Sequence, residues 1–193
     1  MINIVLFGPP GSGKGTQSEK IIDRYNLTHI ATGDLFREHL NNGTDLGKKA
    51  KDYMENGLLV PDQLVIDMVE RKIDDHKDAK GFIFDGFPRT VPQAEALDLM
   101  LKRHGIEIDC TICLDVDEEE LKERIKLRSI TSGRADDQDI KKIEKRIEVY
   151  NKETLPVANY YEGQEKTFYI KGTGTIDQIF SDICEVIDSQ INA

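Results

Sequence analysis

The sequence has few cysteines, no tryptophan and a shortage of positive charge. Its three cysteines lack the even number and the spacing of a disulfide framework, so we predict a cytoplasmic protein. No apolar run approaches membrane-spanning length, and the first residues, MINIVLF, do not resemble a signal peptide. A net charge of −10 argues against a nucleic-acid partner, although a few converging arginines can still bind a small anion.

Two of the cysteines form a C-x-x-C pair, Cys110 and Cys113, which raises the alternative of a redox or metal site. The pair lies in an apolar run, CTICLDV, that is typical of a buried strand. Because strand side chains alternate between faces, this odd spacing places the two thiols on opposite sides of a sheet. Packing in the core is therefore favoured for the pair, and also for Cys184, which lies in an apolar helical stripe.

Short apolar runs alternate with segments of helical periodicity along the 193 residues. The expected strands are 3–7, 27–31, 81–87, 110–116 and 167–170, and the expected helices are 17–25, 34–41, 45–55, one that starts near 61, 91–105, 118–128, 140–147 and 176–187. This alternation predicts an α/β fold, with a five-stranded parallel sheet flanked by helices. Residues 31–60 and 129–138 interrupt it, and we expect them to form two lobes on a core made of 1–30, 61–128 and 139–193.

The segment FGPPGSGKGTQ, residues 7–17, follows the first expected strand and is close to the phosphate-loop pattern G-x-x-x-x-G-K-[ST]. Gly15 stands where the pattern has a hydroxyl residue, and the hydroxyl follows at Thr16. A strand, a glycine-rich turn and a helix start bind anions through backbone N–H groups, and Lys14 adds a full charge. Gly15 costs about 1 kcal/mol of helix propensity relative to alanine, which suggests the close approach of a ligand or another element. A glycine-rich turn without function is the weaker alternative.

GPPGSGKGTQ, with glycine between lysine and threonine, resembles the loop of adenylate kinases and related nucleoside monophosphate kinases. Further segments resemble that family in the same order, from Ile2 to the last helix: TGDLFR (32–37), GLLVP (57–61), DGFPRTVPQ (85–93), ERIKLR (123–128), GRADD (133–137), EKRI (144–147) and GTGT (172–175). The resemblance implies a P-loop-type sheet in a single kinase domain, with an AMP-binding lobe at 31–60 and a lid at 129–138. It also implies the reaction ATP + AMP ⇌ 2 ADP, by direct transfer without a covalent intermediate.

The resemblance further implies a set of residues on the ATP side of the site. They are Gly11, Ser12, Gly13, Lys14, Gly15, Thr16, Arg124, Arg128 and Gly174. Arg124 would pack against the ATP base, Arg128 would bind ATP phosphate, and the Gly174 backbone would reach the adenine. Mg²⁺ would accompany ATP, with Asp85 near it through water and Thr16 as a further candidate.

On the AMP side the resemblance implies a larger set, which carries the acceptor. It comprises Thr32, Gly33, Arg37, Met54, Leu58, Leu59, Val60, Gly86, Phe87, Pro88, Arg89, Gln93, Arg134 and Arg146. Thr32 and Gly33 would lie beside the adenine, and Gln93 would hydrogen-bond it. Arg37 and Arg89 would hold the AMP phosphate. The implied catalytic residues are Lys14, Arg89, Arg128, Arg134 and Arg146.

The predicted lid departs from many bacterial members of that family, because only residues 129–133 separate Arg128 from Arg134. This short-lid form has no room for an extended lid and no cysteines for its zinc-binding version, so no structural zinc is expected. The expected partners are ATP, AMP and ADP, and the expected state is a monomer.

Two other functions remain open. A kinase acting on UMP or CMP is disfavoured, because such relatives usually carry alanine at the position of Thr32, and Gln93 also suits adenine. A non-catalytic nucleotide sensor would be expected to have lost some of the charged residues, and all of them are present.

Overall fold

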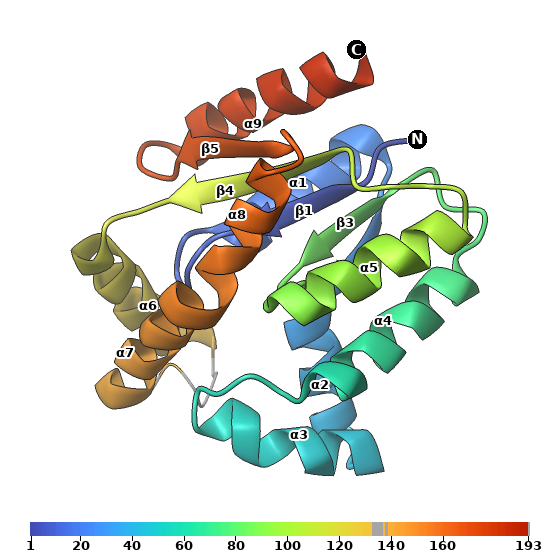
Figure 1. Ribbon diagram of the computed structural model, residues 1–193. Coiled ribbons are helices and arrows are strands. Elements are labelled where there is room, and N and C mark those ends of the chain that lie inside the picture. Colours follow the sequence, from blue (N-terminus) through green and yellow to red (C-terminus); the bar gives the residue numbers. More distant parts are fainter. Residues whose placement is uncertain (133–136, 138, 193) are drawn as a thin grey trace.

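A computed structural model describes residues 1–132, 137 and 139–192, and it confirms the predicted α/β fold (Figure 1). All five strands are parallel, in the order β2-β3-β1-β4-β5. The strands are β1 (Ile4–Phe7), β2 (Thr28–Ala31), β3 (Phe82–Asp85), β4 (Cys110–Asp115) and β5 (Thr167–Lys171). The central strand β1 reads as a continuous apolar run because both of its faces are covered by helices.

The two faces of the sheet contribute to two separate hydrophobic clusters. Ile4 and Leu6 pack with α1 (Lys14–Tyr25) and α9 (Ile176–Ile191). Val5 and Phe7 face the other way, into a cluster with α4 (Asp62–Asp75), α5 (Val91–Arg103) and α8 (Leu155–Glu162). The alternation of side chains along one strand thus fixes which helices cover which face.

The cysteines follow the same alternation. Cys110 belongs to the α1/α9 cluster and Cys113 to the opposite one, and both are free and buried, as is Cys184. Packing in the core is therefore confirmed for these side chains. No described helix is both long enough and apolar enough to cross a membrane.

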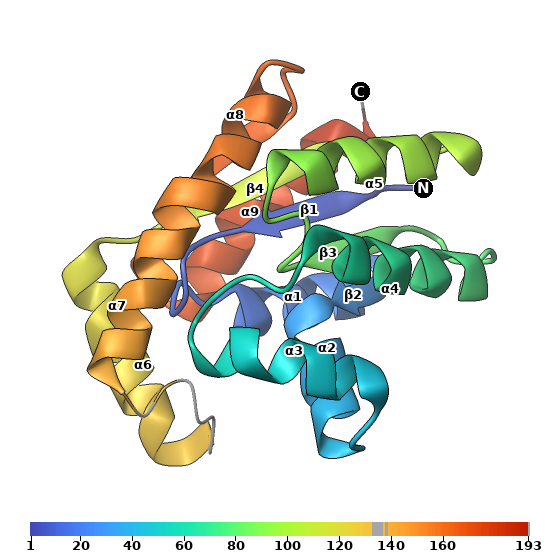
Figure 2. The same cartoon turned by 60° about the horizontal axis from the view of Figure 1, so that its bottom comes forward.

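Two helical extensions stand away from the sheet (Figure 2). One is the pair α2 (Thr32–Asn41) and α3 (Asp45–Glu55), which pack against each other. The other consists of α6 (Glu118–Ser132) and α7 (Ile140–Val149), and α7 continues through a π-helical turn, η2 (Tyr150–Thr154), into α8.

Two expectations for the segment from α6 to α8 were wrong. The helix expected to end at residue 128 continues to Ser132. Within it, the Ser129 Oγ donates to the Lys126 carbonyl at 2.7 Å, a local bond that a serine can make inside a helix. The helical segment formed by η2 and α8 was not expected at all. Residues 133–136 and 138 of the predicted lid lie outside the described part of the chain.

Candidate functional site

The phosphate-type loop connects β1 to the start of α1. Gly11 and Gly13 have φ angles of 86° and 94°, in the left-handed region that glycine adopts readily. A Cβ at Gly11 would also lie 2.8 Å from the Ile125 side chain, so the loop and α6 approach too closely for a larger residue. Helix α1 begins at Lys14 without a capping side chain, which leaves its first N–H groups available to an anion.

Lys14 turns back over the loop that precedes it. Its Nζ donates to the carbonyl oxygens of Gly8 at 2.7 Å and Pro9 at 3.2 Å. These bonds hold the ammonium group at the mouth of the loop, next to the helix start. A lysine fixed there can act as a point charge on a bound phosphate.

Positive charge converges around this lysine. Burial, followed by the positive charges of Arg89, Arg146 and Arg128, lowers the pKa of Lys14 to about 8, and the charge of Asp85 opposes this shift. The three arginines therefore lie close enough for their charges to act on Lys14. On a chain of net charge −10, such convergence creates the local anion site that the sequence only allowed for.

Gly15 has open space beside it. A Cβ built at this position meets no atom of the described residues within 4 Å, so no described element explains the glycine, and we take a ligand as the explanation. We therefore expect Gly15→Ala to raise the free energy of unfolding by about 0.5–1 kcal/mol, since alanine favours the helix. The same variant should weaken nucleotide binding. Urea unfolding and nucleotide titration would measure the two effects, and a gain in stability without loss of binding would contradict a ligand at Gly15.

One pocket collects the acceptor-side residues. Every described residue that the resemblance assigns to AMP lines it, and so does Lys14. They are Thr32, Gly33, Arg37, Met54, Leu58, Leu59, Val60, Gly86, Phe87, Pro88, Arg89, Gln93 and Arg146. Arg134 lies outside the described residues. The pocket opens between the sheet, the α2/α3 pair and α7, so it joins segments that are far apart in the sequence.

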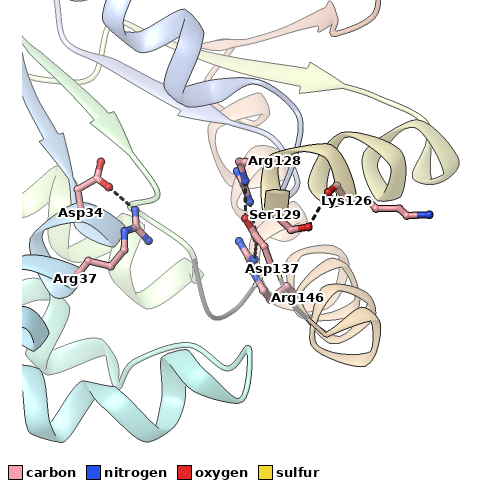
Figure 3. Close-up of polar contacts among 7 residues, drawn as sticks. All are labelled: Asp34, Arg37, Lys126, Arg128, Ser129, Asp137 and Arg146. Carbon is pink, nitrogen blue, oxygen red and sulfur yellow. Dashed lines mark hydrogen bonds and ion pairs between the residues drawn. The ribbon is translucent and has the colours of Figure 1, made fainter. Parts of the chain in front are cut away.

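The carboxyl ends of β2 and β3 form one wall of this pocket. The Thr32 hydroxyl and the Arg89 Nε both donate to the Gly86 carbonyl, each at 2.7 Å. Gly86 has a φ of 75°, and a Cβ there would lie 2.8 Å from the Arg89 guanidinium. A larger residue would therefore displace the arginine from the pocket wall. Arg37 lies across the pocket and pairs with Asp34 one turn earlier on α2 (Figure 3).

The donor-side residues do not line this pocket, with the exception of Lys14. Arg124 is hydrogen-bonded to Glu120 on its own helix at 2.8 Å. Gly174 lies in the turn before α9, which is tied to the loop helix because the buried Gln17 donates to the Ile176 carbonyl at 3.0 Å. Sequence reasoning assigned no role to Gln17, and its place directly after the loop motif was the available signal.

An unexpected carboxylate joins two of the arginines. Arg128 binds Asp137 through two hydrogen bonds of 2.7 and 2.8 Å, and the Arg146 Nη1 donates to the same carboxylate at 2.8 Å (Figure 3). The Asp137 side chain has no exposed surface. Burial alone would raise its pKa, but the hydrogen bonds and charges of Arg128 and Arg146 outweigh burial and hold the pKa of Asp137 below its usual value. The sequence contained Asp137 in GRADD but gave no sign of this role.

The lowered pKa predicts how stability depends on pH. The Asp137 carboxylate contributes stability that is present above its unfolded pKa of about 4, and this contribution is lost as the pH falls through the lower folded pKa. At pH 7 we expect Asp137→Asn to lower the free energy of unfolding by about 1–2 kcal/mol, because both arginines are partly exposed. Urea unfolding between pH 3 and 7 should show the difference from wild type shrinking below about pH 4. The exposed change Asp23→Asn is the control, and a pH-independent difference would contradict the assignment.

Asp85 is a carboxylate close enough to the loop for its charge to act on Lys14. It ends β3, is 16% exposed, and lies 3.9 Å from the His29 Nε2. Among the described residues, no three His, Cys, Asp or Glu side chains come together as a metal site. Mg²⁺ typically binds through one or two carboxylates together with substrate phosphates, and the single carboxylate of Asp85, whose charge acts on Lys14, fits that mode.

Comparisons with known proteins show which family the chain resembles over most of its length. A family model described as "Adenylate kinase" matches residues 6–166. The chain is 53% identical to a Bacteroides fragilis protein named adenylate kinase, over 98% of this chain and 100% of the relative. It is 51% identical to one from Parabacteroides distasonis, over 98% and 99%, and 50% identical to one from Flavobacterium johnsoniae, over 98% and 100%.

Proposed function

The chain belongs to the adenylate kinase family, and from this premise we propose how its residues carry out the reversible reaction ATP + AMP ⇌ 2 ADP. The reaction is a phosphotransfer that interconverts adenine nucleotides. The single observation that best supports these roles is the pocket in which the acceptor-side residues meet Lys14 of the phosphate loop. Phosphoryl transfer demands two anions held in line and charge stabilisation of the moving group, which this pocket can supply.

The donor, ATP, binds at the loop. The backbone N–H groups of residues 11–16 and the Lys14 ammonium hold its phosphates. Arg124 and the Gly174 backbone contact its base. Asp85 would hold Mg²⁺ by way of water, with Thr16 as a further candidate, and the ion would supply neutralisation of charge on the phosphates.

The acceptor, AMP, binds in the pocket described above. Arg37 and Arg89 hold its phosphate, since guanidinium groups bind phosphate oxygens bidentately and stay charged. Thr32, Gly33 and Gln93 face its adenine. The apolar wall against the base and ribose consists of Met54, Leu58, Leu59, Val60, Phe87 and Pro88.

Three arginines stabilise the transferring group. Arg128 and Arg146 lie next to each other on Asp137, and Arg134 follows Arg128 in the sequence. No nucleophilic side chain or general base is required, because the AMP phosphate oxygen attacks directly. Residues 31–60 and 129–138 close over the nucleotides and exclude water, which is the competing acceptor.

An acceptor panel tests this function. The purified protein is given ATP and Mg²⁺ with AMP, GMP, CMP or UMP in separate reactions, and ADP production is followed. We expect fast turnover with AMP alone, and loss of turnover when EDTA removes the metal. Preference for UMP or CMP would contradict the assignment of AMP as the acceptor. ATP binding without turnover of any acceptor would favour a non-catalytic nucleotide sensor.

Location and assembly complete the proposal. Three free, buried cysteines suit a reducing compartment, and we place the protein in the cytoplasm as a monomer that acts on free nucleotides. Sedimentation of the purified protein at micromolar concentration measures the assembly state.

A further inference from the structure

A partly buried hydrogen-bond network connects the N-termini of α4 and α5 beside the acceptor pocket. Asp62 is the first residue of α4, and its Oδ1 accepts hydrogen bonds from the Thr90 Oγ1 at 3.1 Å and the Gln93 Nε2 at 2.7 Å. Thr90 caps α5 by accepting from the Gln93 backbone N–H at 3.3 Å. The other end of the Gln93 amide is occupied as well, because its Oε1 accepts from the Arg89 backbone N–H at 2.8 Å.

These partners determine which way the Gln93 amide points. An ionised carboxylate can only accept and a backbone N–H can only donate. If the amide turned by 180°, its oxygen would face the carboxylate of Asp62 and its NH₂ group would face the N–H of Arg89. Both hydrogen bonds would be lost within a side chain that is 2% exposed, where unsatisfied polar groups are costly.

With its orientation fixed, the Gln93 amide can still make one more hydrogen bond through its oxygen and one more through its nitrogen. Its Oε1 has a second lone pair and its Nε2 a second hydrogen. Adenine presents an amine donor beside a ring-nitrogen acceptor, which this orientation complements. A 6-oxopurine presents a carbonyl oxygen in place of the amine, and would meet the amide oxygen with another acceptor unless the amide turned.

We propose that Asp62 is a positioning residue that locks the Gln93 amide and thereby makes the acceptor pocket select adenine over 6-oxopurines. The inference rests on the proposed function, in which Gln93 faces the adenine of AMP. Asp62 itself does not line the pocket, so it acts through Gln93 rather than on the nucleotide.

The test compares AMP with IMP, whose base differs from adenine in having an oxygen in place of the amine and a protonated N1. In Asp62→Ala we expect the KM for AMP to rise about tenfold, and the ratio of kcat/KM for AMP over IMP to fall about tenfold. The KM for ATP and the kcat at saturating AMP should stay within about threefold of wild type, because donor and phosphate contacts are intact. A residue that only supports the fold would lower turnover with both acceptors equally and leave their ratio unchanged.

Two variants sharpen the result. Asp62→Asn keeps an oxygen that can accept both hydrogen bonds, so its AMP-to-IMP ratio should lie closer to wild type than to Asp62→Ala. Asp67→Ala is the matched control, because Asp67 lies on the same helix and accepts a 2.7 Å bond from Gln63 on the exposed surface. It should behave as wild type.

The outcomes separate the two proposals. Wild-type protein that fails to turn over AMP would contradict the proposed function. Wild-type turnover of AMP together with an unchanged ratio in Asp62→Ala, or with Asp62→Asn no better than Asp62→Ala, would contradict the role of Asp62 alone. If Asp62→Ala turns over too slowly, equilibrium titration of each variant with AMP and IMP in the absence of ATP gives the same ratio.

Discussion

Arg89→Ala should lower kcat/KM for AMP by about 10²–10³-fold, which corresponds to about 3–4 kcal/mol of transition-state stabilisation. Arg89 lines the acceptor pocket, and its charge acts on Lys14. Its Nε is held by the Gly86 carbonyl at 2.7 Å, so the fork of the guanidinium is oriented before any phosphate arrives. Alanine removes both the charge and this orientation.

Steady-state kinetics with varied AMP at saturating ATP measures the effect. Arg103→Ala is the matched control. Arg103 is the last residue of α5, the helix that follows Arg89, and it pairs with Glu70 on the surface. The melting temperature of both variants should stay within a few degrees of wild type. A loss of less than tenfold for Arg89→Ala would exclude a direct role on the phosphate.

Lys14→Met should lower kcat by about 10³-fold while leaving the fold intact. The methionine keeps the length of the stem but cannot donate to Gly8 or Pro9, and it removes the charge at the helix start. Because burial lowers the pKa of Lys14 to about 8, its charge is present below that pH and lost above it. Binding of ATP by the free wild-type enzyme should therefore weaken as the pH rises through 8.

Titration of ATP between pH 6.5 and 9.5 measures this dependence, and Lys14→Met should bind weakly at every pH. Lys20→Met is the control on the same helix, since Lys20 pairs with Asp177 on the surface instead of lying in the loop. A pH profile for Lys14→Met that matches wild type would show that another group causes the dependence.

The sequence predicted the sheet well because each strand is a short apolar run bounded by turn residues. Motifs whose order is shared with a known family led to a set of residues assigned to AMP, and the described members of this set line one pocket. It failed where local signals were mixed: the segment Tyr150–Glu162 carries Pro156 and polar residues, and its helix depends on the packing of Val157 and Tyr161 against the sheet.

The residues that orient the site could not be predicted in the same way. Asp137 and Asp62 gain their roles from partners on other segments, Asp137 from Arg128 and Arg146, and Asp62 from Gln93. A single sequence does not show which carboxylate will face which donor across such distances. The roles of these residues became visible only once the elements were placed in space.

The strand order has a consequence for how the sheet forms during synthesis of the chain. Strand β1 precedes both of its partners in the chain and is the centre of the sheet, where Ile4 pairs with Ile83 on one side and Cys110 on the other. At about 5–20 residues per second, this fully apolar strand must wait several seconds for its first partner. During that time it exposes backbone and side chains that other nascent chains could capture. The segment that leads into the phosphate loop therefore becomes part of a sheet only after β3 has been synthesised.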